Sequence, residues 1–209
     1  MAPLSQAKTL GGVGSILVLL GAIPNVGFVL AIVGFILILV AVKNVSESIN
    51  EPGIFNDMII AVLLTIVGLV VFGVIVVVAF FSFLSSGSQL GTPGTIPPSI
   101  LGAIGLLIVG LVVVWVFYLV SAIFLRRSYE RIGVRLNVNM FQTTGLLYLI
   151  GAALTIVLVG FLILLIAEIL QIVAFFSIPE QLPPSMPPQQ TWGPPAPPAP
   201  MPPSQAPAQ

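Results

Sequence analysis

The stretch GAIPNVGF, residues 21–28, interrupts an apolar run that otherwise extends over residues 10–42. Either the chain crosses a membrane once here, with a kink at Pro24-Asn25, or it turns and goes back. A single helix over the whole run would be roughly 50 Å long, against a hydrocarbon core of about 30 Å. Proline at mid-membrane would also remove a backbone hydrogen bond, and asparagine would need a polar partner. We therefore predict a hairpin of two helices, about 10–23 and 25–42, and keep one kinked crossing as the alternative.

The composition of the chain is that of a membrane protein. Hydrophobic residues make up 58% of its 209 positions and charged residues only 6%, whereas soluble domains carry about 25% charged residues. Three later runs are each longer than the roughly 20 residues that a membrane helix needs, and none alternates as barrel strands do. Because lipid offers no hydrogen bonds to the backbone, helix is the expected form. We predict an all-α polytopic bundle of about five membrane helices, or four if residues 10–42 cross once. The predicted segments are about 10–23, 25–42, 57–84, 99–125 and 143–177.

The C-terminal region has a different character from the helical membrane domain, residues 1–177. Residues 178–209 contain 13 prolines among 32 positions, which is typical of a disordered tail with polyproline II character. It contains P-x-x-P motifs, such as Pro184 to Pro187, which a groove on a partner protein could bind. A solvated spacer is the other interpretation, and the one that we favour.

The basic residues predict an orientation in the cell membrane. Cytoplasmic loops are enriched in lysine and arginine, so the connections 43–57 and 126–142 are expected to be cytoplasmic and the charge-free loop 85–98 to lie opposite. A last helix that crosses once would place the tail, 178–209, outside the cytoplasm; this inference fails if residues 143–177 fold back. The expected topology anchors are Lys8, Lys43, Arg126, Arg127, Arg131 and Arg135. The arginines could also contact anionic lipid headgroups.

Missing residue types exclude several functions. The chain has no cysteine and no histidine, so zinc sites of the common kinds and a Ser-His catalytic site cannot form. There is no Gly-Lys-Ser phosphate loop, and a net charge of zero gives no reason to expect nucleic acid. We predict no enzymatic activity, no cofactor, no metal and no catalytic residue.

Glu168 is the one acid embedded in a long apolar run. An intramembrane carboxyl group is a functional hypothesis by default, as a proton or cation site, and Asn25 is the second candidate. If one helix runs on from Phe141, however, Glu168 would lie about 40 Å further along, at the far membrane interface. A water-filled cavity lined by Thr65, Thr155 and Glu168 would indicate transport, whereas a dry interior packed by glycines would indicate a scaffold.

Glycines in the third and fourth long runs resemble small-residue packing faces. Helix contacts within the bundle are the favoured use, and contacts between copies of the chain are the alternative. These glycines are Gly102, Gly105, Gly110, Gly145, Gly151 and Gly160.

Several stretches together resemble an archaeal multi-pass membrane family, known as domain of unknown function 996. They are AKTLGGVGSIL (7–17), IPNVG (23–27), GIFND (53–57), NMFQTTGLLYLIGAAL (139–154) and AFFSIP (174–179). The resemblance covers about residues 4–179 and implies an integral membrane protein of archaeal type. It assigns no catalytic or binding residue. Some relatives carry a Cys-rich metal ribbon after the last helix, but this chain has only the Pro-rich tail, so the resemblance implies no zinc.

The sequence therefore predicts a structural or interaction role without catalysis, as a small scaffold in the bilayer. The alternative is a transporter or channel component, or an accessory of one, for a small solute or ion. The expected partners are the lipid bilayer, a second copy of the chain through the glycine faces, and a protein that binds the tail.

Overall fold

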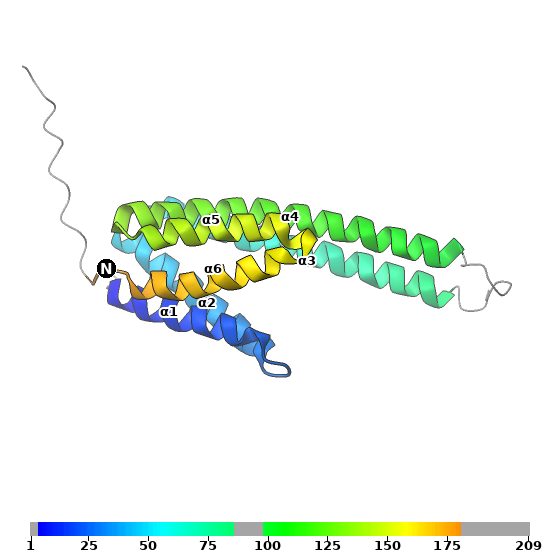
Figure 1. Cartoon of the computed structure of the whole chain (residues 1–209), viewed down its shortest axis with the longest axis horizontal. Coiled ribbons are helices and arrows are strands. Elements are labelled where there is room, and N and C mark those ends of the chain that lie inside the picture. The colour runs from blue at the N-terminus through cyan, green and yellow to red at the C-terminus, as the bar shows by residue number, and fades with distance from the viewer. Residues whose placement is uncertain (1–3, 86–97, 181–209) are drawn as a thin grey trace, which may run out of the picture.

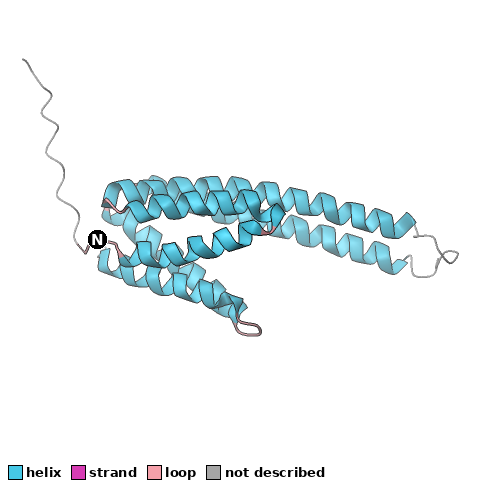
Figure 2. Ribbon diagram, in the orientation of Figure 1, coloured by secondary structure: helices cyan, strands magenta, loops and turns pink. Residues whose placement is uncertain are grey.

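The computed structural model describes residues 4–85 and 98–180, which contain helices and no strand (Figure 2). Five of the described helices are long and apolar enough to cross a membrane, α1 being the exception. The protein is thus an all-α membrane protein, as predicted. The helices are α1 (Leu4–Leu19), α2 (Gly27–Ser48), α3 (Pro52–Ser85), α4 (Pro98–Leu136), α5 (Asn139–Leu154) and α6 (Val159–Phe176), with short 3₁₀ turns η1 (Leu20–Ala22) and η2 (Thr155–Val157).

The predicted N-terminal hairpin is confirmed. Helices α1 and α2 are separated by a turn that contains Pro24 and Asn25 and pack against each other along their length (Figure 1). Asn25 has a φ of 70°, a left-handed conformation that asparagine tolerates better than most residues. The two helices approach closely, because a Cβ on Gly34 would lie only 2.4 Å from the carbonyl oxygen of Gly14.

Helices α3 and α4 form the longest hairpin and extend beyond the other helices (Figure 1). With 34 and 39 residues, they are about 51 and 58 Å long at the usual helical rise. Their far halves expose large apolar side chains, such as Val74, Phe81 and Ile108. In a membrane protein this surface faces lipid.

The predicted single helix over residues 143–177 is wrong, because the chain turns back in the middle of it. Helix α5 ends at Leu154, and α6 returns alongside it after η2 (Figure 1). Leu158, between η2 and α6, has a φ of 62°, and Gly160 lets the two helices meet, since a Cβ there would lie 2.4 Å from the carbonyl oxygen of Gly151. The turn is made of apolar residues, so the sequence offered no polar segment to mark it.

As a result, both ends of the described chain lie at the end of the bundle that carries the basic residues (Figure 1). Ile178 is buried in the same cluster as Leu4, Leu136 and Val138. The expectation that the tail, 178–209, leaves from the opposite end is therefore wrong for residues 178–180. The predicted disorder of the tail falls on residues 181–209, outside the described residues, and most of the predicted loop 85–98 lies outside them too.

The main core lies at this basic end and receives side chains from all six helices. Its largest fully buried members include Ile54, Met58, Tyr129, Phe141 and Phe175. The aromatic rings of Tyr129, Phe141 and Phe175 meet edge to face at 5.1–6.5 Å between centroids, an arrangement that stabilises aromatic pairs.

Four of the six glycines predicted to form packing faces do so within the bundle. A Cβ on any of these four would lie closer than 3.4 Å to another part of the chain, whereas a Cβ on Gly102 or Gly105 would have nothing within 4 Å. The favoured use of the glycines is thus confirmed for Gly110, Gly145, Gly151 and Gly160.

Candidate functional site

Two polar residues lie on one face of α6, in a helix that is otherwise almost entirely apolar. Glu168 and Gln171 are three residues apart, a spacing that places side chains on the same helix face. That face packs toward the interior of the bundle, because Gln171 is only 3% exposed. Both side chains line one cavity between the helices.

Both polar atoms of the Gln171 side chain are hydrogen-bonded, and these bonds join three helices. The hydroxyl of Tyr129 on α4 donates to Gln171 Oε1 at 2.8 Å, and Gln171 Nε2 donates to the hydroxyl of Ser15 on α1, also at 2.8 Å. Ser15 in turn donates to the carbonyl oxygen of Gly11. All three bonds are buried, and the two that Gln171 makes join helices that are far apart in the sequence. Gln171 therefore stabilises the meeting of α1, α4 and α6.

Glu168 has no such set of partners. Its carboxyl group is hydrogen-bonded to Tyr148 of α5. The other carboxylate oxygen, Oε2, is sealed from solvent and has no hydrogen-bond partner among the described residues. Burying a polar group without a hydrogen bond costs free energy, and burying an unpaired charge costs much more. Asp57 Oδ2 is the other buried oxygen without a hydrogen bond among the described residues, but it has Arg131 as an ion-pair partner at 3.3 Å, whereas Glu168 has no basic partner.

The cavity beside Glu168 has a volume of about 180 Å³ and is lined by residues of all six helices. Its polar lining includes Thr65, Ser121 and three tyrosines: Tyr118, Tyr129 and Tyr148. The hydroxyl oxygens of Thr65 and Ser121 are 2.8 Å apart, and they lie 3.1 and 2.7 Å from the carbonyl oxygen of Ala61. Because each hydroxyl has one proton, the two protons are shared among these three contacts, and both are used within the α3–α4 pair.

No basic residue lines this cavity. All six lysines and arginines of the sequence belong to positions outside its lining, so no side chain of the chain supplies a positive charge next to Glu168. Whatever neutralises the carboxyl group must come from outside the protein, as a proton or as a bound cation.

A second cavity, of about 440 Å³, adjoins the first and shares Thr65 and Tyr118 with it. Its lining is mostly apolar and includes Trp115 and Thr155. Neither polar group is free, since Trp115 Nε1 donates to the carbonyl oxygen of Ala152 and the hydroxyl of Thr155 donates to that of Gly151. This cavity is therefore suited to an apolar group.

The structure places the predicted polar candidates in different parts of the molecule. Glu168 lies inside the bundle and not at a far interface, because the turn at residues 155–158 brings α6 back toward the basic end. Asn25 lies exposed in the α1–α2 turn and does not line the cavity. Thr65 and Glu168 share the first cavity, whereas Thr155 lines only the second.

Sequence reasoning missed Tyr129 and attached no site to Tyr118 or Tyr148. Tyr129 is embedded in the basic stretch RRSYERIG, residues 126–133, where an exposed position is the ordinary expectation. Its 1% exposure could have been suspected from the spacing, because residues 118, 122, 125 and 129 follow one helical face.

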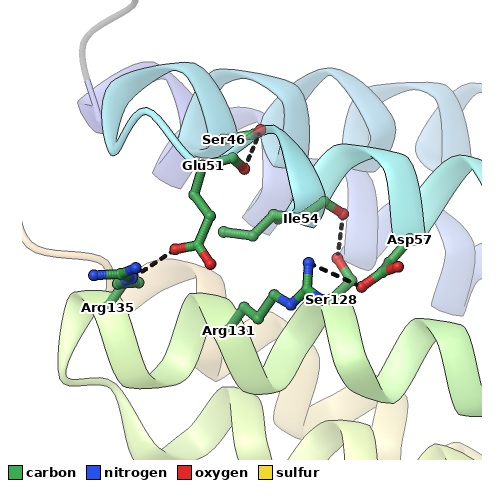
Figure 3. Close-up of polar contacts among 7 residues, drawn as sticks. All are labelled: Ser46, Glu51, Ile54, Asp57, Ser128, Arg131 and Arg135. Carbon is green, nitrogen blue, oxygen red and sulfur yellow. Dashed lines mark hydrogen bonds and ion pairs between the residues drawn. The ribbon is translucent and has the colours of Figure 1, made fainter.

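The predicted topology anchors have local partners. Arg131 Nη1 lies 3.3 Å from Asp57 Oδ2 in α3, and Arg135 Nε lies 2.5 Å from Oε2 of Glu51, the residue before α3, so these two arginines of α4 reach the start of α3 (Figure 3). The hydroxyl of Ser128 also donates to the carbonyl oxygen of Ile54 at 2.9 Å.

Two further anchors, Arg127 and Lys43, have partners within their own helices. The guanidinium of Arg127 lies 5.4 Å from the ring centre of Phe124. Lys43 pairs with Glu47 one turn later at 3.7 Å, and both side chains are more than half exposed, so this pair contributes little to stability.

The comparisons with known proteins give a family. A family model described as a protein of unknown function, DUF996, matches residues 30–169. An uncharacterised protein of Methanocaldococcus jannaschii is 34% identical over 179 residues, which are 86% of this chain and 95% of the relative. No solved structure matches the chain. The matched residues include Glu168 and cover almost completely four of the five helices that could cross a membrane. The family match agrees with the resemblance seen in the sequence.

Proposed function

The chain belongs to the DUF996 family, whose function is unknown, and we propose that it is a non-catalytic membrane component that binds a cation at Glu168, within a transporter or channel for a small solute or ion. One observation carries the proposal: Glu168 Oε2 is buried without a hydrogen-bond partner among the described residues, in a cavity that no basic side chain lines. An acidic group in such a place inside a membrane protein marks an ion or proton site.

The energetics support this use of Glu168. A structural polar group would be expected to be satisfied by its neighbours, as Gln171 is. An acid that is left without a counter-charge retains the ability to take up a proton or a cation and to release it again. That exchange within the hydrophobic layer is the elementary step that ion-coupled transport requires.

The scaffold interpretation is the second candidate, and the glycine contacts favour it. Gly11 and Gly12 pack under the rings of Phe175 and Phe176, so α1 and α6 meet through a tight interface. Under this interpretation the far half of the α3–α4 hairpin, with Gly102 and Gly105 open, would meet a second copy of the chain. The Pro-rich tail would then serve to bind a protein partner.

The positions of the basic residues support an orientation in the cell membrane. All six lysines and arginines lie on the parts of α1, α2 and α4 that contribute to the main core, which also contains Leu4 and Ile178. Since basic residues favour the cytoplasmic side, we place both ends of the described chain in the cytoplasm. Arg126 and Arg127 would lie level with anionic lipid headgroups.

Infrared difference spectroscopy on the purified full chain in lipid nanodiscs tests the cation site. Spectra would be recorded while protons, sodium and potassium are exchanged. We expect a carboxyl band that changes on exchange, disappears in Glu168→Gln and persists in Glu180→Gln, since Glu180 is an exposed acid at the basic end. A band that is unchanged in Glu168→Gln, or no band under any exchange, would contradict the proposal and leave the scaffold interpretation.

A further inference from the structure

The side chains around Glu168 do not form a calcium or magnesium site of the usual kind. Calcium takes six to eight oxygen ligands and magnesium six, and the described residues contain no group of three or more acidic, histidine or cysteine side chains that could hold a metal. Gln171 Oε1 accepts a hydrogen bond from Tyr129, and the hydroxyl oxygens of Thr65 and Ser121 lie within hydrogen-bond distance of each other. Glu168 supplies the only carboxyl group in the lining of this cavity.

Aromatic rings can bind a cation where few oxygen ligands are available. Phe35, Tyr118, Tyr129 and Tyr148 line the cavity together with Glu168. The face of an aromatic ring attracts a cation by its quadrupole, and aromatic cages with few oxygen ligands are the common way in which proteins hold organic ammonium groups. One carboxylate among aromatic rings thus favours an ammonium head over a metal ion.

The second cavity extends the site in an apolar direction. It adjoins the first through Thr65 and Tyr118, and leucines, Trp115 and Phe161 make up much of its wall. The α5–α6 turn also borders it, where Leu158 is 75% exposed on a surface that faces lipid. An apolar substituent could therefore occupy the second cavity and reach it from the bilayer.

We propose that the cation bound at Glu168 is an organic ammonium ion with an apolar substituent, whose charged head lies beside Glu168 and whose substituent fills the cavity lined by Trp115. This inference rests on the proposed cation site and names its substrate class. No covalent step is involved, because the ion exchanges with a proton on the carboxyl group.

Isothermal titration calorimetry on the full chain in nanodiscs tests this inference with benzyltrimethylammonium as the probe. We expect binding with release of a proton, and a loss of affinity of about tenfold or more in Glu168→Gln, because removal of a buried charge partner weakens binding strongly. Glu180→Gln serves as the matched control and should bind as the unaltered chain does. Neopentylbenzene, the neutral analogue of the same shape, should bind much more weakly.

A second variant separates the two cavities. Leu111 lines the second cavity and not the first, so Leu111→Trp should weaken benzyltrimethylammonium and leave tetramethylammonium, which lacks the apolar group, unaffected. An equal loss for both probes would contradict the assignment of the substituent to this cavity.

The outcomes distinguish this inference from the function on which it rests. If the infrared band of Glu168 responds to protons or sodium but no ammonium probe binds, the ammonium inference fails and the cation site stands. If neopentylbenzene binds as well as the cation, the cavities accept apolar molecules such as lipid chains, and the inference fails. If no cation of any kind depends on Glu168, both fail together.

Discussion

The hydrogen bond between Tyr129 and Gln171 allows a quantitative test of the core. Tyr129→Phe removes the hydroxyl that donates to Gln171 Oε1 at 2.8 Å while keeping the ring, and the two side chains are only 1% and 3% exposed. The substitution loses one bond and leaves a buried amide oxygen unpaired, which costs about 1–3 kcal/mol in proteins generally. Hydrogen bonds between membrane helices are worth less, on average about 0.6 and at most about 1.7 kcal/mol. We therefore expect Tyr129→Phe to lower the free energy of unfolding by about 1–2 kcal/mol.

The double-mutant cycle makes this prediction specific to the bond. Gln171→Met keeps a similar volume but removes both amide bonds and leaves the Tyr129 hydroxyl without its acceptor, so it should cost about 2 kcal/mol. In the double variant Tyr129→Phe/Gln171→Met that hydroxyl is gone, and the total should be close to that of Gln171→Met alone. The expected coupling is thus about 1 kcal/mol.

Steric trapping in bicelles measures these free energies of unfolding directly in a bilayer-like environment. Additive costs, with a coupling near zero, would refute the reasoning, since they would mean that Tyr129 and Gln171 do not share a bond in the folded protein.

Two further predictions concern helix packing and topology. Gly34→Ala should lower the free energy of unfolding by about 1–3 kcal/mol, because its Cβ would lie 2.4 Å from the carbonyl oxygen of Gly14. Gly73→Ala is the control and should change the free energy of unfolding by less than about 0.5 kcal/mol, since a Cβ there meets nothing within 4 Å. Equal losses for the two variants in the same unfolding assay would contradict the close approach of α1 and α2. In intact cells, single cysteines at Ser177 and Leu84, in a chain with no native cysteine, should differ in labelling by a membrane-impermeant thiol reagent, with Leu84→Cys labelled and Ser177→Cys protected; equal labelling would contradict the α5–α6 hairpin as a membrane structure.

The sequence predicted the parts of the fold that are marked by local chemistry. The turn at Pro24 and Asn25 breaks an apolar run with residues that are costly in a bilayer, and the long charge-free runs could only be helices. Asn50 and Asn137 follow the ends of α2 and α4 with φ of 53° and 55°, in the left-handed conformation common after a helix. These two asparagines are a local signal that could have fixed both helix ends more closely.

The α5–α6 turn could not be predicted because its residues give no comparable signal. TIVLVG, residues 155–160, contains no proline, no charge and no asparagine, and it places a leucine at positive φ, where leucine is rare. A turn inside an apolar layer does not need to be polar, so the polar and charged residues on which membrane topology prediction relies are missing there. The expectation that the tail leaves from the opposite end of the bundle followed directly from missing this one turn.

The hydrogen bonds that join Ser15, Tyr129 and Gln171 could not be predicted from the sequence for a different reason. Gln171 and Ser15 are 156 residues apart in the chain, and Tyr129 and Gln171 are 42 apart. No spacing rule connects them, since they meet only because three helices pack together. Glu168 could be singled out from the sequence because one acid in an apolar run is conspicuous, but its surroundings depended on the unpredicted turn.

Glu168 and Gln171 have opposite energetic roles, although they lie one turn apart on the same face of α6. Both polar atoms of the Gln171 side chain make a hydrogen bond, so its removal should only cost stability. Glu168 keeps one carboxylate oxygen buried and unpaired, and replacement of an unsatisfied buried acid by a hydrophobic residue is often neutral or stabilising. A chain selected only as a scaffold would gain from such a replacement.

This contrast yields a prediction that separates the two proposed functions. Glu168→Leu should leave the free energy of unfolding unchanged or raise it by up to about 2 kcal/mol, because the gain from removing the buried acid is partly offset by the lost bond to Tyr148. Gln171→Leu, the matched change on the same helix face, should lower it by about 2 kcal/mol. At the same time Glu168→Leu should abolish cation binding in the infrared experiment. If steric trapping instead finds that both variants lose the same stability, Glu168 belongs to the structural network, and the scaffold becomes the better account of why this acid lies inside the membrane domain.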